Sequence, residues 1–174
     1  MTGIDAAEVS RQLIDGHALV VADARGKAFE RVAEYMFTSL GCTVRTNLTS
    51  PLHSEQIDLA VVHVGLLAPL PNFFLVECKY WEKPVDSAAV GYFINICLSR
   101  NITLAIIVSR IGITGNAANA SAAHSLAYGA SARGLHLVVL TEADLSAVSS
   151  NEEMTLLLTR AWMQAVATGG VGTP

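Results

Sequence analysis

Two charged residues flank a cysteine at the end of an apolar run, in the segment Glu77-Cys78-Lys79 that follows Phe73–Val76. Because side chains of an extended strand alternate between its two faces, Glu77 and Lys79 project to one side and Cys78 to the other. A carboxylate and an ammonium group held together at the edge of a buried sheet suggest metal binding and activation of a water molecule. The simplest alternative is a surface ion pair, which contributes only about 0–1 kcal/mol to stability.

A further carboxylate, Asp58, opens a second apolar run that ends at Val64. The connection over 65–71 contains a glycine and two prolines, which are typical of a loop. If the two runs pair as an antiparallel hairpin, Asp58 lies opposite Glu77 or Cys78, where cross-strand neighbours are about 4.5–5.5 Å apart. That spacing would allow the carboxylates to share a metal ion. The alternative is that Asp58 caps the turn before its strand.

A predicted helix over 26–40 supplies one more carboxylate. Its apolar residues recur at helical spacing from Phe29 to Leu40, and Gly41 is the expected end of the helix. Glu30 lies at the border of this apolar stripe, about 100° round the helix from Phe29. It can therefore lean over the edge of the sheet, and the alternative is an ordinary solvated position.

The helix, the aspartate strand and the Glu-x-Lys strand, in this order, resemble the PD-(D/E)XK nuclease superfamily, and more narrowly its Mrr-type restriction endonuclease-like domains. The resemblance covers about residues 24–146. The similar segments are Gly26–Glu30, Gln56–Leu59, Val76–Trp81, Ile106–Thr114 and His136–Leu145. Ile57 stands where the superfamily motif has proline, a common substitution that leaves the role of Asp58 in place.

The resemblance implies a metal-dependent endonuclease that hydrolyses phosphodiester bonds of DNA, of a restriction, defence or repair type. The implied catalytic residues are Glu30, Asp58, Glu77 and Lys79. Asp58, Glu77 and the backbone carbonyl of Cys78 would bind Mg²⁺, for which Mn²⁺ substitutes. Glu30 would bind a second ion, or the first one through water. Lys79 would position the attacking water and help to deprotonate it.

The net charge of −4 is unusual for a protein that binds nucleic acid, because contacts to phosphate dominate the affinity. Local basic residues remain, and we expect weak intrinsic affinity for DNA that is helped by a homodimer or by a partner protein. The candidate contacts to DNA are Arg25, Lys27, Gln56 and Lys83. Tyr80 and Trp81 are expected mainly to pack, with contact to DNA as the alternative.

An apolar fraction of 52% and a charged fraction of 15% over 174 residues predict one well-buried domain. Sequence patterns predict helices at 6–14, 26–40, 86–99, 116–131 and 151–167, and strands at 43–48, 57–64, 72–81, 103–109 and 135–140. Their order favours an α/β fold, a restriction-endonuclease-like three-layer α/β/α core with a mixed central sheet of about five strands. This domain is expected to span 1–167, with a flexible tail at 168–174.

The sequence contains no apolar stretch of the ~20 residues that cross a bilayer, and its first residues lack the features of a signal peptide, so we expect a cytoplasmic protein without membrane contact. His63, His124 and His136 lack metal-ligand spacing and are expected to be structural. Two other functions remain open. One is a structure-selective nuclease that resembles archaeal Holliday-junction resolvases. The other is a non-catalytic nuclease-fold subunit for nucleic-acid binding or assembly, which the acidic balance favours.

Overall fold

The computed structural model describes residues 3–50, 55–116 and 122–174, which contain one five-stranded sheet. Its strands, in spatial order, are β1 (Thr43–Thr49), β2 (Gln56–Val62), β3 (Phe73–Lys79), β4 (Leu104–Ser109) and β5 (His136–Thr141). Strands β1, β2 and β3 are antiparallel neighbours, whereas β3, β4 and β5 run parallel. This arrangement confirms the predicted mixed sheet of five strands.

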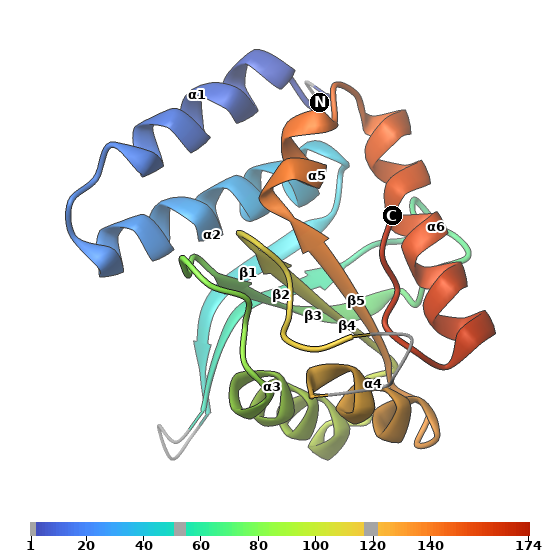
Figure 1. Cartoon of the computed structure of the whole chain (residues 1–174). Coiled ribbons are helices and arrows are strands. Elements are labelled where there is room, and N and C mark those ends of the chain that lie inside the picture. The colour runs from blue at the N-terminus through green and yellow to red at the C-terminus, as the bar shows by residue number, and fades with distance from the viewer. Residues whose placement is uncertain (1–2, 51–54, 117–121) are drawn as a thin grey trace.

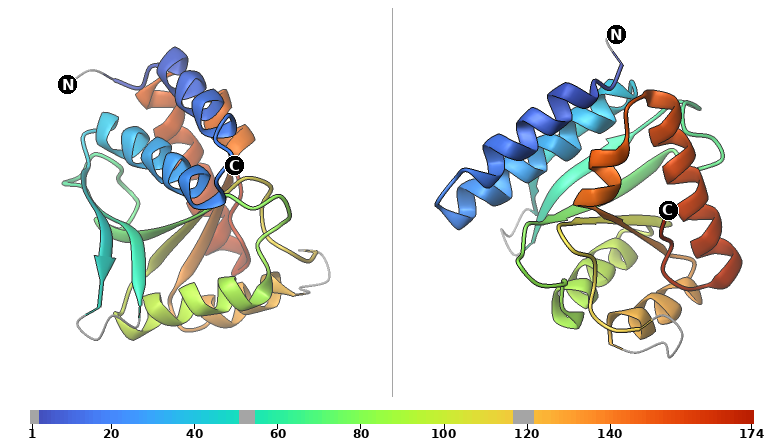
Figure 2. Two further views of the ribbon diagram at one scale, coloured as in Figure 1. Left: turned by 90° about the vertical axis from the view of Figure 1, so that its left-hand side faces the viewer. Right: turned by 45° about the horizontal axis from the view of Figure 1, so that its top comes forward.

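Helices cover both faces of the sheet and complete the predicted three layers (Figure 1). The first face carries α1 (Ala6–His17), α2 (Ala22–Ser39), α5 (Glu142–Ala147) and α6 (Asn151–Thr168), and the second carries α3 (Ser87–Ser99) and α4 (Ala123–Ser131) (Figure 2). Each layer has its own apolar core, and neighbouring residues of β4, such as Ile106 and Ile107, enter different cores. A strand buried on both faces requires a continuous apolar run, as β4 has. None of the described helices is long and apolar enough to span a bilayer.

The predicted hairpin is present, because β2 and β3 pair antiparallel with Leu59 opposite Val76. His63 follows β2 and is 2% exposed. Its ring organises the connection to β3, because Nδ1 accepts a hydrogen bond from the backbone N–H of Leu67 at 3.2 Å and Nε2 lies 3.0 Å from the carbonyl oxygen of Pro71. His63 is therefore structural, as predicted.

Several helix bounds differ from the prediction. Helix α1 runs on to His17, and α2 begins at Ala22, four residues before the predicted start at Gly26. The added first turn of α2 contains good helix formers and Asp23, whose negative charge suits a helix N-terminus. The predicted helix over 116–131 falls partly outside the described residues, and the described helix there begins at Ala123.

The C-terminal segment, for which the sequence predicts a flexible tail, lies against β5 in the structure. After α6 the chain turns back at Gly169, and Gly172 pairs with β5: its N–H donates to the carbonyl of Leu137 and its carbonyl accepts from the N–H of Val139, each at 2.9 Å. A Cβ at position 172 would lie 2.0 Å from the carbonyl oxygen of Ala161, so only glycine fits. The glycines that suggested flexibility instead allow this close approach.

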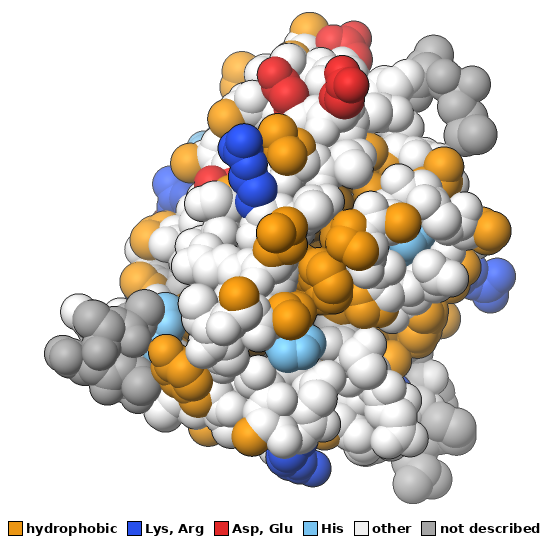
Figure 3. Space-filling view, turned by 90° about the vertical axis from the view of Figure 1, so that its right-hand side faces the viewer, with side chains coloured by type: hydrophobic (Ala, Val, Ile, Leu, Met, Phe, Trp, Pro, Cys, Tyr) orange, Lys and Arg blue, Asp and Glu red, His pale blue; other side chains and the backbone are white. Residues whose placement is uncertain are grey.

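Helix α6 buries one side and exposes another. Met154, Leu158, Ala161 and Ala165 are buried in the core. The exposed apolar residues of the helix are Leu156, Met163 and Val166. Figure 3 shows the molecule from the right-hand side of Figure 1, where hydrophobic side chains gather on the surface. Helix α6 therefore covers the sheet with its buried side and leaves apolar residues exposed on the other side.

Candidate active site

The carboxylate of Asp58 forms a hydrogen bond between β2 and β3, just beyond the last residue pair of their ladder. Asp58 is only 7% exposed, and its Oδ2 accepts a hydrogen bond from the backbone N–H of Cys78 at 2.8 Å. Continuing the register one step past the Leu59–Val76 pair places Asp58 opposite Glu77. The bond therefore runs between strands rather than capping a turn, and it holds the carboxylate beside the backbone of the Glu-x-Lys segment.

Glu77 and Lys79 form an ion pair, in which Lys79 Nζ contacts Glu77 Oε1. Their side chains are 12% and 25% exposed, so the pair is largely removed from solvent and is not the surface pair considered above. The second carboxylate oxygen of Glu77, Oε2, is buried and has no hydrogen-bond partner among the described residues. A buried oxygen without a partner is costly, and a bound cation would satisfy it.

A pocket of about 480 Å³ brings these side chains together between the β2–β3 pair and α3. It is lined by Thr49, Glu55, Gln56, Asp58, Glu77, Lys79, Ala89 and Tyr92. An ion pair between Glu55 and Arg100, at 2.5 Å, joins the start of β2 to the end of α3 and so supports the pocket. A larger groove of about 750 Å³ lies between α1 and α2, but none of the charged pocket residues lines it.

The walls contributed by α3 were not predicted from the sequence. Ala89 and Tyr92 belong to no recognisable sequence motif. Their place in the pocket depends on how α3 packs against the sheet. His53 precedes Asp58 in the sequence, where contact with DNA or metal is an alternative to an ordinary polar loop. It lies in the β1–β2 connection, outside the described residues.

Glu30 approaches the same region from α2, on the other face of the sheet. It is half-buried and does not line the pocket. Burial and the negative charge of Asp58 raise the pKa of Glu30, and the positive charge of Lys79 offsets part of this effect. The structure thus places Glu30 within electrostatic range of the pocket. Among the residues that the structure describes, no three His, Cys, Asp or Glu side chains form a ready-made metal cluster.

Burial and the neighbouring charges determine the protonation state of Lys79. Burial and the charge of Asp58 raise the pKa of Glu77 to about 7, against the attraction of Lys79. Burial alone would lower the pKa of Lys79, but Glu77 and Asp58 together outweigh this effect and raise that pKa above its ordinary value. Lys79 is therefore an ammonium group at neutral pH. Such a group is better suited to holding a water or a phosphate oxygen than to accepting a proton.

The four predicted contacts to DNA lie in different places. Gln56 lines the pocket. Arg25 lies at the start of α2, with its guanidinium 5.8 Å from the ring centre of Tyr80. Lys27 is exposed and pairs at 2.9 Å with an aspartate one turn earlier, and Lys83 is exposed in the segment after β3.

The family of the chain is shown by a comparison with protein-family models. A family model described as "Restriction endonuclease" (Mrr_cat) matches residues 21–141, which run from α2 to the end of β5. The chain therefore belongs to this family of nucleases of the restriction-endonuclease type. A solved structure described as "Protein of Unknown Function AF1548" is similar at 15% sequence identity and a TM-score of 0.43, covering 82% of this chain and 78% of that chain. A comparison with curated proteins finds no significant match.

The hydrogen bond from Cys78 to Asp58 leads to a prediction about stability. Asp58→Ala should lower the free energy of unfolding by about 1–3 kcal/mol, because the buried N–H of Cys78 loses its acceptor. Asp58→Asn should leave the metal-free protein at least as stable as wild type, because an amide oxygen can accept the same bond while a charge that repels Glu77 is removed. Urea denaturation in EDTA measures both. Equal losses in the two variants would contradict the prediction.

Proposed function

We propose that the chain is a metal-dependent endonuclease that hydrolyses phosphodiester bonds in DNA. The observation that carries this proposal is the convergence of Asp58, Glu77 and Lys79 in one pocket at the end of the β2–β3 ladder. These residues lie within the segment that matches the restriction endonuclease family. Two carboxylates beside an ammonium group are the donor set that metal-assisted hydrolysis of a phosphodiester needs.

Asp58, Glu77 and the backbone carbonyl of Cys78 would hold Mg²⁺ or Mn²⁺, and Glu30 would bind it through water or bind a second ion. Mg²⁺ takes oxygen ligands and keeps several of its own waters, so two carboxylates and one carbonyl suffice. The buried Oε2 of Glu77, without a partner among the described residues, supports this assignment. When bound, the ion would supply polarisation of the scissile phosphate and stabilisation of the leaving oxygen.

Lys79 would orient the attacking water and neutralise charge that develops on the phosphate. Its ion pair with Glu77 restrains the side chain, and its raised pKa keeps the amine protonated. A charged donor that is already in place costs no reorganisation when the reaction occurs. The positioning part of the role predicted from sequence is retained, whereas the proton-accepting part is disfavoured by this pKa.

Cleavage assays test the proposal directly. Supercoiled plasmid, linear duplex, four-way junction and single-stranded DNA are each incubated with the protein and Mg²⁺ or Mn²⁺, with EDTA as the control. We expect metal-dependent nicking or cutting of duplex DNA. Strong preference for the four-way junction would favour a structure-selective nuclease instead. Absence of cleavage of every substrate with both metals would contradict the proposed function.

Metal binding should also appear as added thermal stability. Mg²⁺ or Mn²⁺ that binds only the folded state adds about 2.7 kcal/mol when its concentration is 100 times the Kd, so the melting temperature should rise with metal concentration. Glu77→Gln should reduce this shift strongly, while Glu152→Gln, which changes an exposed carboxylate on α6, should not. Differential scanning fluorimetry provides the measurement. A melting temperature that stays constant up to millimolar metal would favour a non-catalytic assembly subunit.

The net negative charge of the chain limits how tightly one subunit would bind DNA. A net charge of −4 leaves few cations for phosphate contacts by one subunit. We therefore propose that a homodimer or a partner protein adds to the affinity. The exposed apolar residues of α6, Leu156, Met163 and Val166, are available for such contact.

A further inference from the structure

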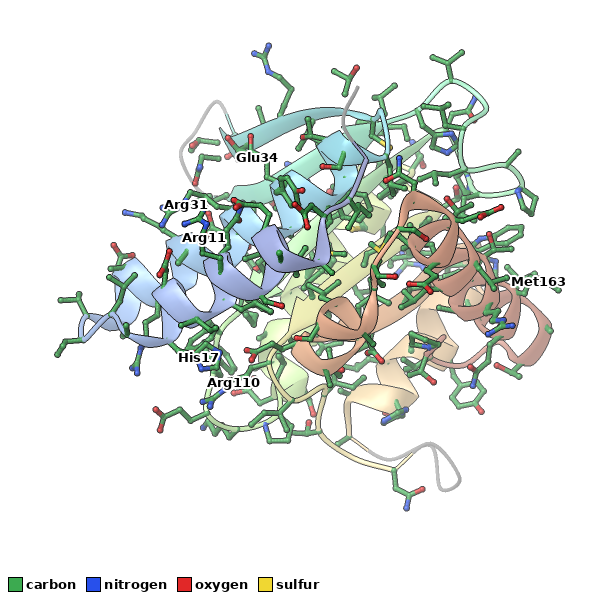
Figure 4. The ribbon with its side chains drawn as sticks, turned by 90° about the horizontal axis from the view of Figure 1, so that it is seen from above. Arg11, His17, Arg31, Glu34, Arg110 and Met163 are labelled. Atoms are coloured by element: carbon green, nitrogen blue, oxygen red, sulfur yellow. The ribbon has the colours of Figure 1, made fainter. Side chains whose placement is uncertain are left out.

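Tyr80 directly follows Lys79, the last residue of β3. The guanidinium groups of two arginines lie over the Tyr80 ring. The guanidinium carbons of Arg25 and Arg110 lie 5.8 and 5.3 Å from the ring centre. Edge contacts with the rings of His17 and Phe29, at centroid distances of 5.7 and 5.6 Å, keep the Tyr80 ring in place. Figure 4 shows His17 and Arg110 beside each other at one end of the molecule. We call Arg25, Tyr80 and Arg110 the arginine–tyrosine cluster.

The two positive charges of this cluster are poorly neutralised by the protein. Arg110 forms no ion pair with any residue in the described part of the chain. The acidic neighbour of Arg25 is Glu82, which is 3.8 Å away and has a side chain that is 74% exposed. The Nε of Arg25 is buried and has no hydrogen-bond partner within the described ranges. The carboxylate of Glu142 contacts His17 at 2.8 Å through Oε1, and among the described residues it forms no ion pair with either arginine.

The cluster lies at the end of the sheet where the candidate active site is. Arg110 follows Ser109, the residue paired with Lys79 across β3 and β4, and its backbone N–H donates to the carbonyl of Lys79 at 3.2 Å. Arg25 precedes Glu30 by five residues of α2, a distance of about 7.5 Å along the helix axis. Since strand residues alternate in direction, Tyr80 points away from Lys79 and packs on Phe29 beneath α2.

We propose that Arg25 and Arg110 bind a backbone phosphate of duplex DNA that flanks the phosphodiester at the candidate active site. A guanidinium held over an aromatic ring keeps its N–H groups free at its edge, and these bind phosphate oxygens in pairs. Tyr80 positions both arginines, and its adjacency to Lys79 would link phosphate binding to the site of hydrolysis. The identity of the ligand rests on the proposed function.

Binding measurements in EDTA, where no metal-dependent cleavage occurs, test the inference. We expect Arg110→Ala and Arg25→Ala each to weaken binding of a fluorescent duplex about tenfold. Each should also reduce the slope of log K against log salt by about 0.9, the value for one phosphate contact. Arg133→Ala is the matched control, because this exposed arginine precedes β5 at the opposite end of the parallel strands. Tyr80→Phe keeps the ring and should bind as wild type.

Two results would overturn the inference: no measurable binding by wild type, or equal affinities and salt slopes for Arg110→Ala and Arg133→Ala. Arg110→Gln, which preserves more packing, replaces Arg110→Ala if that variant does not fold. Cleavage with Mg²⁺ is assayed separately. Binding that depends on Arg110 without cleavage contradicts only the proposed function, and cleavage with unchanged binding by Arg110→Ala contradicts only this inference.

Discussion

Lys79→Ala should lower the rate of DNA cleavage by at least about 100-fold, the effect of removing one preorganised donor from a developing negative charge. The ion pair with Glu77 holds this ammonium group in the pocket. Because both side chains are largely buried, the loss should appear in kcat as well as in kcat/KM. Single-turnover cleavage of plasmid DNA with Mg²⁺ measures the rate.

Further variants separate the effect of the Lys79 charge from the effect of the shape of its side chain. Lys79→Met keeps the length of the side chain without its charge and should be as inactive as Lys79→Ala. Arg160→Ala removes an exposed positive charge from α6, remote from the pocket, and should cleave as wild type does. Circular dichroism confirms that each variant is folded. Near-normal cleavage by Lys79→Met would mean that the ammonium group has no catalytic role.

Glu77→Gln should remove a pH dependence of stability that wild type shows in EDTA. Burial and the charge of Asp58 raise the pKa of Glu77 from its ordinary 4.5 to about 7 in the folded protein, so the folded state binds this proton more tightly than the unfolded state does. Its contribution is therefore fully present below pH 4.5 and is lost as the pH rises through about 7. A rise in pKa of this size corresponds to at most about 3–4 kcal/mol.

Urea denaturation at pH 5 and pH 8 tests the sign as well as the size of this effect. Wild type should be less stable at pH 8, and Glu77→Gln should lose most of the difference because a neutral amide does not titrate. Glu30 adds to the effect in the same direction, since its pKa is also raised by burial and by Asp58. Glu152→Gln, on the surface of α6, should keep the wild-type pH dependence. Wild-type stability that rises from pH 5 to pH 8 would contradict the prediction.

The placement of Asp58, Glu77 and Lys79 was predictable because it depends on local geometry. Alternation along a strand puts Glu77 and Lys79 on one side, and a hairpin with a short connection brings Asp58 beside them. Both statements need only the sequence of β2, β3 and the loop between them, and the register with Leu59 opposite Val76 agrees with them. The apolar run likewise predicted a strand at 103–109, and the structure shows that every residue of β4 is buried.

Other features depend on contacts between residues far apart in the chain. The glycine-rich C-terminal segment has the composition of a flexible tail, yet Gly172 pairs with β5. The space beside Ala161 admits no side chain, so this pairing requires glycine at position 172. The arginines on Tyr80 come from α2 and from the loop after β4, and only the packed sheet brings Arg25 and Arg110 to one ring.

Residue types and their periods were therefore enough to predict the five strands, the mixed sheet and the acidic residues beside Lys79. The wall of the pocket formed by α3, the buried state of Glu77 and the docking of the C-terminal segment arise only in the folded protein. The physical reason is range: strand alternation and hairpin pairing act between near neighbours in the sequence. Burial, which sets the pKa of Glu77 and leaves its Oε2 without a partner among the described residues, depends on every layer around it.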